Sequence, residues 1–207
     1  MNILIVSSSA NGERSVSGQL AARYAEAVLA GNPAARIVRR DVGAEPLPHL
    51  TAATVAAIKG EPTTEAEFEA RALSDTLIAE MKAADVIVIA SPMYNFGMSS
   101  TLKSWFDHVA RAGVTFRYTA AGPEGLLGDK KAVVIESRAG HYGEGGTPHL
   151  DGQEPHIRTL LGFVGITDMT YVRAEKPAFG PETAEASIEA AARELTALAQ
   201  GELRLAA

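Results

Sequence analysis

Residues 86–118 read VIVIASPMYNFGMSSTLKSWFDHVARAGVTFRY and decide the fold class. The first five residues form an apolar, β-branched run that is typical of a buried strand. A loop with two aromatic residues, an amide and a glycine follows, and residues 99–111 then have the apolar spacing of an amphipathic helix. Open α/β sheets hold their ligands at the carboxyl ends of such strands. A loop of this composition in that position favours a flat heteroaromatic ligand with polar edges.

Strands and helices alternate on both sides of this segment. The patterns predict further strands at residues 3–7, 36–41, 132–136 and 167–173. They predict further helices at residues 17–30, 64–84, 154–164 and 181–200. Three segments lie outside this alternation: a loop with a short helix at 43–60, a hairpin at 114–118 and 122–128, and a loop with five glycines at 139–152. Five strands separated by helices predict an α/β fold, a parallel sheet covered on both faces, and the flavodoxin-like strand order 2-1-3-4-5 fits best.

Composition restricts the partners and the location. The 207 residues predict one domain, and the net charge of −6 with only isolated basic pairs argues against nucleic acid and membrane as partners. The sequence has no cysteine and no recognisable secretory signal, so we expect a cytoplasmic protein. The five histidines lack the spacing of metal ligands, so no metal site is predicted.

The loop after the first strand has the composition of a phosphate site. Residues 7–18 read SSSANGERSVSG and lead into a helix, whose amino terminus offers free N–H groups and a partial positive charge. Neither a P-loop pattern nor a GxGxxG pattern is present. A plain helix cap at Ser15 or Ser17 is the alternative interpretation, since serine is common at that position. Five serines in eleven residues favour phosphate binding.

Taken together, these motifs resemble the FMN-dependent NADH azoreductases, which also act as quinone reductases. The likeness covers nearly the whole chain in order, and its most specific stretches are PMYNF and ARAGVTFRYT. The matching segments are SSS at 7–9, SVSGQL at 15–20, SPMYNF at 91–96, LK at 102–103, ARAGVTFRY at 110–118, GPEGL at 122–126, SRAG at 137–140 and LGFVGI at 161–166.

The resemblance implies a flavodoxin-like homodimer that binds FMN near the subunit interface and uses NADH as electron donor. It assigns the FMN phosphate to Ser9, Ser15, Val16 and Ser17, and the isoalloxazine ring to Met93, Tyr94, Asn95 and Phe96. The other side of the ring falls to Ser137, Arg138, Ala139 and Gly140. Tyr118 and Phe163 correspond to aromatic residues that border the substrate space in such dimers.

Two residues depart from the family pattern. Val16 stands where the family often has glutamine, which removes one side-chain donor from the first loop. Ala139 stands where the family often has glycine, and an alanine would be strained there if its φ were positive. Arg138 has two interpretations, either stabilising negative charge on the reduced ring or forming a salt bridge at the surface.

The implied activity is a ping-pong reaction in which FMN carries the chemistry and no side chain acts as a nucleophile. NADH reduces the flavin, and a quinone or azo compound then takes its place and receives the electrons. Two alternatives remain at this point: a flavodoxin-type electron carrier without its own substrate site, and a general NAD(P)H-dependent FMN reductase. The sequence does not distinguish NADH from NADPH or identify the physiological acceptor.

Overall fold

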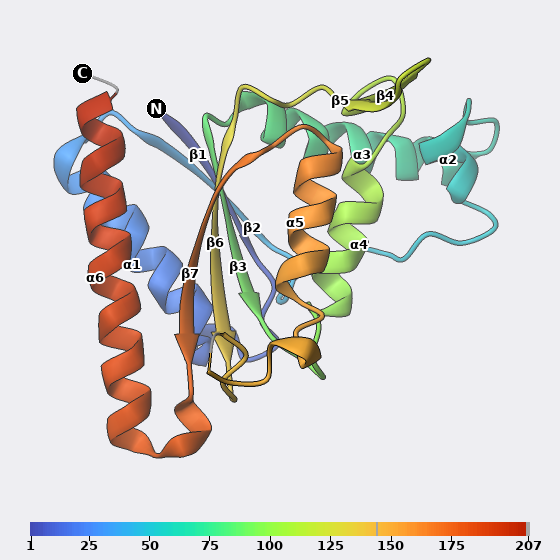
Figure 1. Cartoon of the computed structure of the whole chain (residues 1–207). Helices are drawn as coiled ribbons and strands as arrows, with labels where there is room; N and C mark the ends of the chain where they lie inside the picture. The colour runs from blue at the N-terminus through green and yellow to red at the C-terminus, as the bar shows by residue number, and fades with distance from the viewer. Residues whose placement is uncertain (144, 206–207) are drawn as a thin grey trace.

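A five-stranded parallel sheet forms the centre of the computed structural model, which describes residues 1–143 and 145–205 (Figure 1). Its order is β2-β1-β3-β6-β7, which is the predicted 2-1-3-4-5 order once the hairpin strands are left out of the count. The strands are β1 (Asn2–Ser7), β2 (Arg36–Asp41), β3 (Val86–Pro92), β6 (Lys131–Arg138) and β7 (Asp168–Glu175). The predicted hairpin is confirmed as the antiparallel pair β4 (Phe116–Thr119) and β5 (Gly122–Gly125).

Helices cover both faces of the sheet, as predicted (Figure 1). On one face lie α1 (Val16–Gly31) and α6 (Pro181–Leu205), and on the other lie α3 (Glu65–Ala83), α4 (Ser100–Val109) and α5 (Glu154–Phe163). The short helix α2 (Val55–Lys59) packs on α3. Three 3₁₀ turns complete the elements: η1 (Gly12–Arg14), η2 (Pro148–Leu150) and η3 (Pro177–Phe179).

The buried strand β3 separates two apolar cores. Alternate side chains of a strand point to opposite faces, so Ile87 and Ile89 pack toward α3, α4 and α5, whereas Val86 and Val88 pack toward α1 and α6. Trp105 of α4 is fully buried in the first of these cores.

Helix α4 is shorter than the predicted segment 99–111 because the chain turns at its end. The Thr115 hydroxyl donates to the Val109 carbonyl (2.7 Å) and accepts from the Arg111 N–H (3.0 Å). These bonds satisfy backbone groups that another helical turn would have used. The sequence pattern reflected apolar spacing alone and did not show this competing turn.

The two edges of the sheet have different neighbours. At the carboxyl edge, where the arrowheads of the strands lie in Figure 1, are the loops that follow β1, β3 and β6. The hairpin β4–β5 lies toward the opposite, amino edge. It is held there by the link between α5 and β7, because the Leu127 N–H donates to the Val164 carbonyl (2.9 Å). A Cβ on Gly125 would lie 2.0 Å from the Gly165 nitrogen, so this contact is backbone against backbone.

Candidate functional site

Three loops predicted to bind a ligand meet at the carboxyl edge of the sheet. They follow β1, β3 and β6, which are neighbours in the sheet. The Met93 N–H donates to the Ser137 carbonyl (2.8 Å), which joins the second loop to the third. The Tyr94 hydroxyl accepts from the Ala10 N–H (3.1 Å), which joins the second loop to the first. The fold therefore brings together segments that lie more than 120 residues apart.

The first loop ends in a capped helix. Ser15 is the N-cap of α1, and its hydroxyl accepts from the Gly18 N–H (3.0 Å), so the capping interpretation holds for this residue. Its oxygen also lies 3.3 Å from that of Ser17, and both side chains are buried. A cap does not exclude an anion, because the N–H groups of Val16 and Ser17 lie in the first turn, where a helix provides no carbonyl partner.

A cavity of about 520 Å³ opens beside this helix terminus. Serine hydroxyls, glycine backbone and the end of β2 form its wall, with Ser9 and Ser15 on the helix side and Arg39 and Asp41 on the strand side. The donor set is made of hydroxyls, N–H groups and the positive end of a helix dipole. This set fits a phosphate monoester. Two basic residues, Arg39 and Arg40, also line the cavity, together with the acidic residues Glu13 and Asp41.

The second loop is a tight turn with strained backbone. Tyr94 and Gly97 exchange two backbone hydrogen bonds (2.8 and 3.0 Å), and between them Asn95 has φ +47° and Phe96 has φ +69°. Positive φ is uncommon for any residue with a side chain and is an outlier for one as bulky as phenylalanine. Both side chains are exposed, Phe96 by 50%. The turn therefore presents an amide and an aromatic ring to a ligand at the edge.

The third loop has no strained residue at the alanine substitution. Neither Ala139 nor Gly140 has a positive φ, so the strain expected for alanine does not arise. Their carbonyls instead accept from backbone N–H groups of residues 178 and 176 (3.1 and 3.0 Å), beyond the end of β7. Ser137 is half-buried, at the end of β6.

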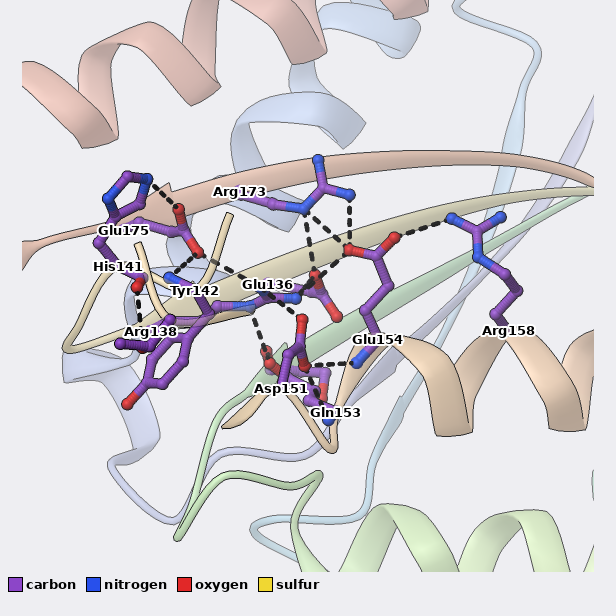
Figure 2. Close-up of polar contacts among 12 residues, drawn as sticks. Glu136, Arg138, His141, Tyr142, Asp151, Gln153, Glu154, Arg158, Arg173 and Glu175 are labelled. Carbon is purple, nitrogen blue, oxygen red and sulfur yellow. Dashed lines mark hydrogen bonds and ion pairs between the residues drawn. The ribbon is translucent and has the colours of Figure 1, made fainter. Parts of the chain in front are cut away.

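Arg138 forms salt bridges, as one of the two interpretations from the sequence held, but inside the protein and not at the surface. It is 2% exposed, so it is not a surface residue, and its guanidinium is surrounded by carboxylates rather than directed at a ligand (Figure 2). It pairs with Glu136, with Asp151 (2.9 Å) and with Glu175 (3.2 Å). Only the backbone of Arg138 remains available to a ligand. The sequence pattern could not show this, because two of these partners lie 13 and 37 residues further along the chain.

The electrostatics of this cluster centre on Glu136. Burial raises the pKa of Glu136 to about 8, although the neighbouring Arg138 opposes the shift; Glu154 and Asp151 add to it. Burial also disfavours the ionised form of Glu154, but hydrogen bonds from Arg158 and Arg173 outweigh that effect and lower its pKa. Sequence reasoning missed Glu136 because a charged residue within an apolar strand pattern indicates an interruption rather than a buried ion pair.

Tyr118 and Phe163 lie away from these loops in the same chain. Tyr118 belongs to the hairpin at the amino edge and is 74% exposed. Phe163 ends α5, which runs from the carboxyl edge to the amino edge. Phe116 connects the two aromatic rings, with ring centroids 5.4 Å from Tyr118 and 4.4 Å from Phe163. The fold thus brings these two residues close to each other but not to the three loops at the carboxyl edge of the same chain.

Two features are absent from the described part of the chain, residues 1–143 and 145–205: a membrane-spanning helix and a group of metal-ligating side chains. None of its helices combines the length and apolar character needed to cross a membrane. None of its His, Asp and Glu side chains form a group of three or more that could hold a metal ion.

Comparisons with known proteins show the family of the chain. A family model described as a flavodoxin-like fold matches residues 1–199. An FMN-dependent NADH:quinone oxidoreductase from Hyphomonas neptunium is 53% identical over 199 residues, which cover 96% of each chain. The crystal structure of azoreductase AzrA is 30% identical, with a TM-score of 0.88 over 96% of this chain and 99% of that one. An azoreductase structure from Bacillus anthracis is also 30% identical, with a TM-score of 0.87 over 96% and 98%.

Proposed function

Since the chain belongs to the flavodoxin-like family, we propose that it is an FMN-dependent NADH oxidoreductase that reduces quinones to hydroquinones and azo compounds to amines. The names of its relatives point to the cofactor, the donor and both acceptor classes. The observation that carries the proposal is the meeting of three loops at the carboxyl edge of β1, β3 and β6. Residues 1–207 then act as one FMN-binding domain.

The residues at this edge fit FMN. The phosphate is assigned to the α1 terminus, where Ser9, Ser15 and Ser17 supply hydroxyls and Val16 its N–H group. The cavity beside that terminus and the donor set described above support this placement.

The isoalloxazine ring is assigned to the two other loops. Met93, Tyr94, Asn95 and Phe96 line it on one side, and Ser137, Ala139, Gly140 and the backbone of Arg138 close the other. Support comes from the exposed amide and aromatic ring of the strained turn, a combination suited to a flat ring with polar edges. In this arrangement Asn95 and nearby N–H groups hydrogen-bond the polar edge of the ring.

Bound FMN would supply the redox chemistry, taking two electrons as hydride from NADH and passing them to the acceptor, in one cycle for a quinone and in two cycles for an azo compound. The protein binds and orients the reactants, and no side chain needs to act as a nucleophile. We propose that donor and acceptor use one place in turn, which is a ping-pong scheme. Parallel lines in double-reciprocal plots of initial rate would support this scheme, and intersecting lines would exclude it.

A second copy of the chain completes the proposed substrate space. Tyr118 and Phe163 lie at the amino edge of their own chain, so they serve a site at the carboxyl edge only if another protomer supplies them. Tyr118 is 74% exposed, as expected for an aromatic residue that a partner protomer covers. We therefore propose a homodimer, located in the cytoplasm where NADH is available, with no nucleic-acid or membrane partner.

The deciding experiment is an absorbance spectrum of the purified protein with added FMN, before and after NADH is added without oxygen. A flavin spectrum that bleaches with NADH supports the oxidoreductase, and assays with quinones and azo dyes then identify the acceptor. Bleaching only with dithionite would favour the electron carrier or an NADPH enzyme. Failure to bind FMN would overturn the assignment of all three loops.

A further inference from the structure

The guanidinium of Arg138 connects four separate parts of the chain inside the protein (Figure 2). It bonds to Glu136 on its own strand, to Asp151 at the end of the glycine-rich loop and to Glu175 at the end of β7. Its Nε donates to the Gln153 side chain (3.1 Å) at the start of α5. A buried charge requires such compensation, so these partners are fixed relative to one another.

The same partners hold the beginning of the loop at residues 139–152. One Glu175 oxygen accepts from the Tyr142 N–H (3.0 Å) while it pairs with Arg138. The other Glu175 oxygen lies 3.8 Å from His141. The beginning of the loop is therefore attached to the end of β7 through one partly buried carboxylate.

They also hold the end of the loop. Asp151 uses one oxygen for Arg138 and the other for the Gln153 and Glu154 N–H groups (2.9 and 3.1 Å). The Gln153 amide in turn donates to the carbonyl and hydroxyl of Ser91 (2.9 Å each), just before the strained turn. Both ends of the loop thus depend on one guanidinium.

The loop in turn contacts the aromatic residue of the strained turn. The Gly152 N–H donates to the Phe96 carbonyl (2.8 Å), and a Cβ on Gly152 would lie 2.9 Å from that oxygen. The Tyr142 ring stands edge-on to the Phe96 ring, with centroids 6.2 Å apart. A displacement of the loop would therefore move both rings.

We propose that Arg138 and Glu175 are positioning residues whose partly buried pair holds the described residues of this loop, 139–143 and 145–152, and so sets where Tyr142 and Phe96 stand beside the flavin ring. The proposal rests on the proposed function, because it assigns a role at the same site. It adds Tyr142 to the wall of the substrate space, and it makes acceptor selectivity depend on two side chains, those of Arg138 and Glu175, that touch neither flavin nor acceptor.

The test uses Glu175→Gln, which keeps the size of the side chain but removes its charge. The first measurement is hydrogen exchange of the Tyr142 amide in the full chain saturated with FMN. A hydrogen bond to a charged acceptor is typically stronger than one to a neutral acceptor. We therefore expect the Tyr142 amide to exchange about tenfold faster in Glu175→Gln than in the native protein. This readout does not depend on turnover.

The second measurement is steady-state kinetics with a bulky azo dye and with a small benzoquinone. We expect the KM for the dye to rise about fivefold, with kcat within about twofold and the benzoquinone little affected, because a displaced wall alters binding more than chemistry. The visible flavin spectrum should shift as the rings beside it move. A return toward native values in Glu175→Asp, which restores the charge, would separate positioning from general damage.

The matched control is Glu189→Gln, which breaks an exposed ion pair with Arg23 between α1 and α6. It should leave exchange, kinetics and spectrum unchanged. Native exchange at Tyr142 together with a native KM in Glu175→Gln would overturn the positioning role. If the unsubstituted protein fails to bind FMN, the proposed function fails instead, and the exchange measurement on the FMN-free chain still tests whether Glu175 holds the loop.

Discussion

Replacing Glu136 with glutamine should change how stability depends on pH. The carboxyl group is fully buried, and burial raises its pKa from the ordinary value of 4.5 to about 8 in the folded protein. Below pH 4.5 both the folded and unfolded chains carry the proton, so its contribution to stability is fully present. Between the two pKa values only the folded chain keeps the proton, and stability falls as pH rises. Above about pH 8 the loss is complete.

The magnitude follows from the size of the shift. Inside this window each pH unit lowers the free energy of unfolding by about 1.4 kcal/mol, so two units from pH 5.5 to 7.5 amount to about 2.7 kcal/mol. Glutamine does not titrate, so the free energy of unfolding of Glu136→Gln lacks this decrease. Relative to the native protein, the variant should become more stable by about the same amount between pH 5.5 and 7.5. The groups facing Glu136 are Arg138 on β6, Asp151, Glu154 on α5 and Arg173 on β7. They are present in both proteins.

Urea unfolding of FMN-free protein at pH 5.5, 6.5 and 7.5 measures this difference. Fluorescence of Trp105, the only tryptophan and a fully buried one, reports the transition. Glu189→Gln serves as a control for loss of an exposed carboxylate. A stability difference between Glu136→Gln and the native protein that stays constant within about 0.5 kcal/mol would refute the reasoning. It would mean that Arg138 keeps Glu136 ionised and that the ion pair outweighs burial.

Four further substitutions test the fold and the proposed sites. Ser15→Ala removes the cap of α1 and should cost about 1 kcal/mol in urea unfolding, together with weaker FMN binding in a fluorescence titration. Gly125→Ala places a Cβ 2.0 Å from the Gly165 nitrogen and should lower stability by about 2 kcal/mol or more, whereas Gly128→Ala, with 3.4 Å of space, should be nearly neutral in the same thermal melt. Tyr118→Ala, at an exposed position, should change stability by less than about 0.5 kcal/mol and yet raise the quinone KM, and an unchanged KM would argue against a shared substrate space.

The sheet could be predicted from sequence because its strands follow a simple rule. Residues 86–90 are apolar throughout, and β3 is buried on both faces, as a central parallel strand must be. The prediction for β6 ended at residue 136, but the strand continues to Arg138. Arg138, its last residue, is buried by charge pairing rather than by apolar packing. Hydrophobic periodicity detects burial by apolar packing but not burial by charge pairing.

The candidate site was predictable to the level of loops. Parallel strands end at one edge, so the segments after β1, β3 and β6 had to meet, and they do. Side-chain direction was not predictable in the same way. Asn95 and Phe96 take positive φ values, which no local sequence rule anticipates for a phenylalanine. Tyr142, which stands against Phe96, carried no motif of its own.

The direction of the chain also determines which residues can share a site within one protomer. A helix that joins two parallel strands must start at the carboxyl edge and end at the amino edge, so Phe163 at the end of α5 lies at the opposite edge from Gln153 at its start. Tyr118, coupled to Phe163 through Phe116, lies at that opposite edge as well. A motif that assigns Tyr118 and Phe163 to the flavin therefore requires a second protomer. The topology therefore supports the proposed homodimer, because one chain does not bring Tyr118 and Phe163 to its own carboxyl edge.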